Sequence, residues 1–164
     1  MRTIVKSFLL VLVLFTCLLP SGCVPDPERH EGDVIMEVAI FPAGTGEESY
    51  YFIVNQNGEL NCFKGARQID EMDINRFYRR IDQQEEKQLS EAELQCLLDY
   101  AEILRASGYS YDRIGAEDSW HYTVLYNDTI YEMDRMDNEP ELLRKVIEEI
   151  IRLSPIPVDL HGWA

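Results

Sequence analysis

The stretch WHYTVLYNDTIYEM, residues 120–133, decides the fold class of this chain. Aromatic and β-branched residues alternate with more polar ones on both sides of residues 127–128, and Asn-Asp is typical of a tight turn between antiparallel strands. A two-residue turn at this point places Met133 opposite Tyr122, because side chains of paired strands alternate in step. The stretch therefore predicts a β-hairpin with one apolar, aromatic face.

A second hairpin is predicted nearer the N-terminus, from β-rich runs at residues 50–55 and 59–64. The two runs flank Asn57-Gly58, a pair that favours a type I′ turn because both residues tolerate positive φ angles. Residues 34–41 form another β-rich run.

Residues 74–88 give a less regular signal. We expect a strand over residues 74–82, followed by a polar connector over residues 83–88.

Two helices are predicted from their caps and apolar stripes. Ser90 and Glu93 form a capping box at the start of the first helix, and Gly108 ends it. The second helix begins near Asn138 and closes at Ser154, just before a proline. The apolar positions of each helix share one side: Leu94, Leu97, Leu98, Ala101 and Leu104 in the first, and Leu143, Val146, Ile147, Ile150 and Ile151 in the second.

The predicted order is several strands, a helix, a hairpin and a closing helix. Short hairpin connections join antiparallel neighbours, so this order predicts an α+β fold: an antiparallel sheet of about five to six strands with two helices packed on one face. We assign residues 34–164 to this single domain, which is long enough to bury a core.

The N-terminus carries the features of an export signal. Arg2 and Lys6 precede the apolar run FLLVLVLFTCLL at residues 8–19. A membrane-spanning helix needs about 20 apolar residues, so this run is too short to span a bilayer and is typical of a signal peptide.

Ser21-Gly22-Cys23 follows that run and resembles the lipobox of bacterial lipoproteins. The leucine that usually lies three residues before the cysteine is Leu19 here, four residues before it. The resemblance implies a signal peptide over residues 1–22, cleavage before Cys23, and a palmitate-type lipid on that cysteine. It also implies a location outside the cytoplasm, anchored to the bacterial cell membrane. The alternatives are an ordinary secreted protein with an incidental Cys23, or an uncleaved anchor.

Residues 23–33 are predicted to form a lipidated tether, because they are polar, contain two prolines and lack periodicity. The ten residues after the cysteine reach at most about 35 Å when extended, so the domain should lie close to the bilayer. Removing residues 1–22 takes away two cations and no acid, so the formal net charge changes from −15 to −17. Such an acidic chain is repelled by phosphate backbones, which excludes nucleic acid as a partner.

The order of elements also resembles the emfourin family of metalloprotease inhibitors, as well as several bacterial families with no assigned activity. The similarity is carried by the helix cap at residues 89–93 (LSEAE) and by the closing helix that starts at residues 140–142 (PEL). These are generic capping and core positions, and no inhibitory residue of that family matches a position of this sequence. The resemblance implies a fold, and it makes inhibition of a secreted protease the alternative to a non-catalytic binding or accessory module.

No motif indicates catalysis or metal binding. His30, His121 and His161 lie far apart and lack the short spacings of zinc ligands. Cys62, His121 and Asp118 have the chemistry of a nucleophilic triad, but no G-x-S-x-G elbow or comparable motif brings them together. We therefore expect no catalytic residue, no metal ligand and no cofactor.

Two cysteines of the predicted domain leave two interpretations open. Cys62 and Cys96 can form a disulfide outside the cytoplasm, worth about 3–4 kcal/mol by loop entropy, or they can be free thiols.

Three aromatic residues are the candidate contact residues. Tyr109, Tyr111 and Trp120 bracket a loop where exposed rings suit a protein, peptide or glycan partner. The interpretation that we favour is that Trp120 belongs to the core and the tyrosines shield a sheet edge, since aromatics are ordinary strand residues. The expected partners are thus the membrane, through lipid on Cys23, and an unidentified protein, peptide or glycan.

Overall fold

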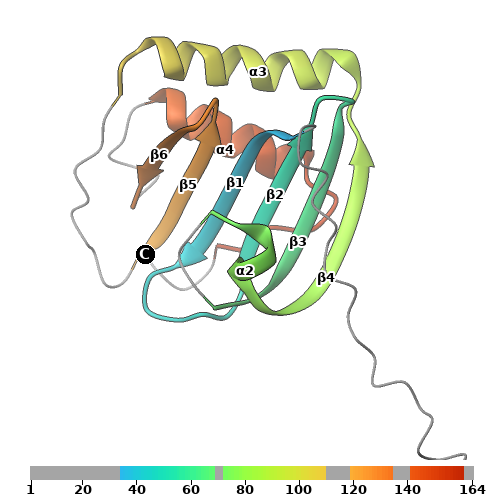
Figure 1. Cartoon of the computed structure of the whole chain (residues 1–164), viewed down its shortest axis with the longest axis vertical. Coiled ribbons are helices and arrows are strands. Elements are labelled where there is room, and N and C mark those ends of the chain that lie inside the picture. The colour runs from blue at the N-terminus through green and yellow to red at the C-terminus, as the bar shows by residue number, and fades with distance from the viewer. Residues whose placement is uncertain (1–33, 69–71, 110–118, 135–140, 161–164) are drawn as a thin grey trace, which may run out of the picture.

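The computed structural model describes residues 34–68, 72–109, 119–134 and 141–160. These residues form a six-stranded antiparallel sheet, with the spatial order β4-β3-β2-β1-β5-β6, and three helices (Figure 1). The predicted α+β class is therefore confirmed. In chain order the elements are β1 (Val34–Pro42), β2 (Ser49–Asn55), β3 (Glu59–Arg67), α2 (Ile74–Phe77), β4 (Tyr78–Gln88), α3 (Glu91–Ala106), β5 (Trp120–Tyr126), β6 (Thr129–Met133) and α4 (Glu141–Leu153).

Helices α3 and α4 cover the same face of the sheet, as predicted (Figure 1). The apolar stripes of the two helices pack against the strand side chains that face them. Together these residues form the larger of two buried clusters. The main helical members of that cluster are Leu97, Ala101, Leu104, Leu143, Val146, Ile147 and Ile150. Burial of these side chains supplies the main driving force for docking the helices on the sheet.

The opposite face of the sheet carries a second, smaller core. The single-turn helix α2 brings Phe77 against Tyr51 of β2, with 4.9 Å between ring centroids, and against Phe41 of β1, with 6.0 Å. Strands β1 and β2 are therefore buried on both sides over most of their length. This explains why the sequence of β1 reads as a nearly continuous apolar run rather than as an alternation.

The predicted start and end of α3 are confirmed. The Ser90 hydroxyl accepts a hydrogen bond from the Glu93 N–H at 3.3 Å, and the Glu93 carboxylate accepts one from the Ser90 N–H at 2.9 Å. These hydrogen bonds lower the pKa of Glu93 to about 2, because they favour the ionised carboxylate. Gly108 follows the helix with φ 67°, a left-handed conformation that favours glycine.

The register of the β5–β6 hairpin is also confirmed. Tyr122 pairs with Met133, and Val124 pairs with Tyr131. Asn127 and Asp128 have φ angles of 48° and 57°, so the connection is the two-residue turn whose twist matches that of the flanking strands.

The predicted hairpin of β2 and β3 is confirmed, but its turn is not the type I′ turn expected at Asn57-Gly58. Strand pairing leaves three residues between β2 and β3, and Gly58 alone among them has a positive φ, of 80°. Its N–H donates to the carbonyl oxygen of Asn55 at 3.0 Å. A three-residue connection commonly needs a single left-handed residue after an ordinary turn, and glycine supplies it here.

The expectation for residues 74–88 is confirmed only for residues 78–82, which lie in a strand; it is wrong for residues 74–77 and 83–88. Residues 74–77 form α2, where the Asp73 side chain accepts a hydrogen bond from the Asn75 N–H at 3.1 Å. The residues expected as a connector belong to β4, which pairs with β3 at the edge of the sheet. Most β4 side chains are exposed, so the strand lacks the apolar periodicity from which strands are predicted.

Truncating Leu97 or Ile147 to alanine should lower the free energy of unfolding by about 2–5 kcal/mol, because both side chains are fully buried. Ile103→Ala is a matched control on α3, since its side chain is 50% exposed and its loss should cost under about half a kcal/mol. Urea denaturation measures all three variants. Equal losses for Leu97→Ala and Ile103→Ala would contradict the placement of α3.

Candidate functional site

Buried polar side chains gather on the sheet face opposite α3 and α4. In the described part of the chain, the buried polar residues are Glu37, Ser49, Asn55, Ser119, His121, Thr123 and Asp134. Those within strands alternate with residues that face the two helices. Burying a polar group costs free energy unless it gains a partner, so this face differs chemically from the apolar one.

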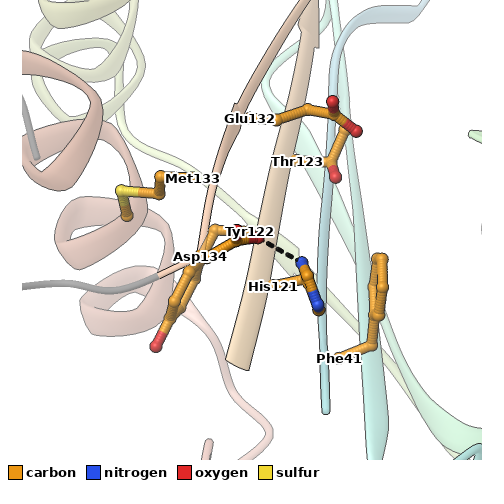
Figure 2. A pocket seen from close by; sticks show the side chains of 7 residues that line it. All are labelled: Phe41, His121, Tyr122, Thr123, Glu132, Met133 and Asp134. Atoms are coloured by element: carbon orange, nitrogen blue, oxygen red, sulfur yellow. Dashed lines mark ion pairs between the residues drawn. The ribbon is translucent and has the colours of Figure 1, made fainter. Parts of the chain in front are cut away.

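An ion pair between His121 and Asp134 ties the start of β5 to the end of β6. Nδ1 of His121 lies 2.5 Å from a carboxylate oxygen of Asp134, and the two residues are only 8% and 6% exposed (Figure 2). The imidazole stacks on the ring of Phe41, with 5.5 Å between centroids. The carboxylate and the ring together fix the orientation of the histidine.

A shallow surface hollow lies beside this ion pair (Figure 2). It encloses no space large enough for a water molecule, so it is a surface against which a neighbouring group can lie and not a ligand pocket. Its lining includes two carboxylates, those of Glu132 and Asp134, and no lysine or arginine. The full lining is Phe41, His121, Tyr122, Thr123, Glu132, Met133 and Asp134.

Two further polar contacts stabilise the middle of this face. The Tyr51 hydroxyl of β2 donates a hydrogen bond to the Glu37 carboxylate of β1, and both groups are buried. The Arg67 guanidinium lies 4.4 Å from the centroid of the Phe41 ring and donates to the carbonyl oxygens of Pro42 and Thr45 at 3.0 and 3.1 Å. Arg67 thereby holds the connection between β1 and β2 in place.

These contacts were missed by the sequence analysis, although two signals were present. Glu37 is a charged residue inside an apolar run, which in a buried strand requires a polar partner. The predicted hairpin register, extended by one residue beyond Tyr122 and Met133, places Asp134 opposite His121.

Strand β6 forms one edge of the sheet and pairs with β5 on its other side. Its Ile130 side chain is 57% exposed. The hydroxyl of Tyr109, in the segment after α3, donates to the carbonyl oxygen of Glu132 at 3.0 Å. Tyr109 also packs against the larger core, so this predicted contact residue shields part of the edge.

Of the two interpretations of Trp120, the structure confirms the favoured one, burial in the core, and contradicts its role as a contact residue. Its ring is 4% exposed and belongs to the larger core, 6.3 Å from the ring of Tyr50. Trp120 points to the helix side of β5, where it is covered, so no partner can stack on it. Tyr111 lies outside the described residues, as does Cys23 with the rest of the predicted tether.

Both cysteines of the described chain are free thiols, so the structure has no disulfide between Cys62 and Cys96. Cys62 lies on the helix side of β3, whereas His121 lies on the opposite side of the sheet, so the structure does not bring them together. Asp118, the third residue considered for a triad, lies outside the described residues. Burial raises the pKa of the Cys62 thiol to about 11.

Among the described residues, no three histidine, cysteine, aspartate or glutamate side chains lie close enough together to hold a metal ion. None of the described helices is both long and apolar enough to cross a membrane. No protein-family model, no curated protein and no solved structure matches this chain. The resemblances to bacterial lipoproteins and to the emfourin family therefore stay predictions.

Cysteine labelling should separate the two thiols of the domain. With a pKa of about 11, Cys62 is almost entirely protonated at neutral pH and is also buried, so it should resist alkylation in the folded protein. The partly exposed Cys96 should react with iodoacetamide, and both should react after denaturation without reductant. Peptide-resolved mass spectrometry measures this. Protection of both until a reductant is added would instead demonstrate a disulfide.

Asp134→Ala should lower the free energy of unfolding by about 3–5 kcal/mol, because it leaves the buried His121 without its ion-pair partner. His121→Ala and the double variant complete a cycle, in which the two losses should not add, since the residues interact directly. Glu132→Ala, two residues before Asp134 in β6, is the control, since this partly exposed carboxylate has no ion pair among the described residues. Strictly additive losses would show that the pair does not contribute as a unit.

Proposed function

We propose that this protein is a lipid-anchored bacterial protein whose folded domain is a non-catalytic binding module for a protein or peptide partner. The observation that carries the proposal is the order of the first residues: two cations, an apolar run over residues 8–19, and Ser21-Gly22-Cys23. The apolar run is too short to span a bilayer, and small residues directly before a cysteine suit cleavage and lipidation at that point.

The proposed anchor sets where the domain acts. Strand β1 starts at Val34, eleven residues after Cys23, so the domain lies within a few tens of ångströms of the bilayer. The acidic chain gains nothing from anionic lipid head groups, so the acyl chains supply the membrane affinity. A partner must therefore come to the membrane surface or already reside there.

The surface of the domain favours a protein or peptide over the other partner classes. The hollow beside Glu132 encloses no space for a small molecule, and the ring of Trp120, a candidate for stacking on a glycan, is in the core. An exposed sheet edge with an apolar side chain at Ile130 suits main-chain pairing with an extended segment. A protease inhibitor would be one form of such a module.

Cys23→Ala should move the protein from the membrane fraction to the soluble fraction, or block its maturation, because the lipid has no other attachment point in the proposal. Fractionation and metabolic labelling with a palmitate analogue measure both effects. Cys17→Ala is the matched control: this cysteine lies inside the apolar run after bulky residues, and its loss should change neither result. Unchanged fractionation and unchanged labelling of Cys23→Ala would overturn the anchor.

A further inference from the structure

We propose that β6 binds an extended segment of a protein partner by strand addition, and that a lysine or arginine of that segment forms an ion pair with the Glu132 carboxylate. This inference rests on the proposed function, because it names the surface and the partner chemistry of the binding module. Strand addition supplies affinity through main-chain hydrogen bonds and specificity through pockets for alternate side chains.

The hairpin geometry determines which backbone groups of β6 are available. In a two-residue hairpin, Thr129 exchanges hydrogen bonds with Tyr126, so Ile130 and Glu132 direct their N–H and C=O groups away from β5. The hydrogen bond from Tyr109 to the Glu132 carbonyl confirms this outward direction. A carbonyl oxygen accepts two hydrogen bonds, so that of Glu132 retains capacity for an added strand. Within the described chain, the outward groups of Ile130 have no hydrogen-bond partner.

The two edges of the sheet differ in how far they resist strand addition. Strand β4 presents several exposed charges, including Arg79, Arg80 and Asp82, and its pairing with β3 is interrupted by two register shifts. Exposed charges and bulges are common devices that protect sheet edges. Strand β6 has one charged residue, Glu132, and a large exposed apolar side chain at Ile130. Strand β6 is therefore the edge open to a partner.

The negative charge beside β6 determines the kind of side chain that can pair with this edge. Ile130, Glu132 and Asp134 alternate with core residues, so they share the face on which the hollow lies. A strand added beside β6 places alternate side chains on that same face, next to Glu132. Asp134 is already paired with His121, whereas the carboxylate of Glu132 has no ion pair among the described residues. A cation supplied by the partner complements it.

A second copy of this chain is the less suitable occupant. The chain has a formal net charge of −15, so two copies repel each other. Strand β6 itself carries no lysine or arginine, so β6 of a second copy would offer Glu132 no cation from within the strand. The nearby Arg105 is already bound to Glu102 at 2.7 Å. Charge complementarity thus favours a basic segment of another protein.

The test uses synthetic peptides and the full chain in a mild detergent. One capped six-residue peptide alternates lysine with valine, a second has glutamate in place of lysine, and a third repeats the lysine peptide with N-methylated alternate amides. Isothermal titration calorimetry gives the affinities, and NMR spectroscopy measures the chemical shifts of the Ile130 and Glu132 amide groups. We expect the lysine peptide to bind and to shift both amide signals. The glutamate and N-methylated peptides should bind at least roughly tenfold more weakly.

Two charge-reversal variants separate the effect of the Glu132 carboxylate on peptide binding from the effect of the general acidity of the chain. Glu132→Lys should weaken the lysine peptide roughly tenfold and favour the glutamate peptide. Glu86→Lys makes the same charge change at an exposed position on the opposite edge, in β4, and should leave both affinities unchanged. Equal weakening by both variants would show non-specific attraction and would overturn the inference.

The remaining outcomes distinguish this inference from the proposed function. No peptide binding, together with membrane attachment that still depends on Cys23, overturns the inference and leaves the anchor standing. Peptide binding at β6 by a protein whose membrane attachment does not depend on Cys23 supports the inference and overturns the anchor. Self-association that Glu132→Lys abolishes, without peptide binding, assigns the edge to a second copy and also overturns the inference.

Discussion

The pairing of β1 with β2 on one side and β5 on the other is the interaction on which the rest of the domain depends. It joins the four N-terminal strands to the C-terminal hairpin, and β1 and β5 are far apart in the chain. Without the β1–β5 ladder, the sheet separates into the β5–β6 hairpin and a four-stranded sheet, β4-β3-β2-β1, joined through α3. Neither part alone covers the apolar faces of both α3 and α4. Docking of the helices on the sheet and pairing of β1 with β5 therefore depend on each other.

The central position of β1 also explains the chemistry of its residues. Met36, Val38 and Ile40 face α3 and α4, whereas Ala39 and Phe41 contribute to the smaller core around α2. A carboxylate in such a strand is costly unless it is hydrogen-bonded, and the Tyr51 hydroxyl provides that partner for Glu37. The smaller core is therefore a mixture of aromatic packing and satisfied polar groups, which makes its geometry more specific than apolar contact alone.

The two ends of the sheet reflect different physical constraints. Charged side chains and register shifts along β4 permit a long strand at an exposed edge. Strand β6 is short, is tied to β5 by the His121–Asp134 pair, and is partly covered by Tyr109. The ion pair holds the end of the hairpin rigid, and a rigid edge loses less conformational entropy when another segment pairs with it.

The sequence alone determined the features that depend on neighbouring residues: the register of β5 with β6, the Ser90–Glu93 cap and the apolar stripes of both long helices. These signals are local because they come from turn geometry, capping hydrogen bonds and helical periodicity. Part of the candidate site could have been predicted as well, because the same register places Asp134 opposite His121. Only the tertiary structure decided the strand order, the identity of β4, the burial of Trp120 and the partnership of Glu37 with Tyr51. Each of these depends on which segments cover one another after folding, and that burial is set by contacts between residues distant in the chain.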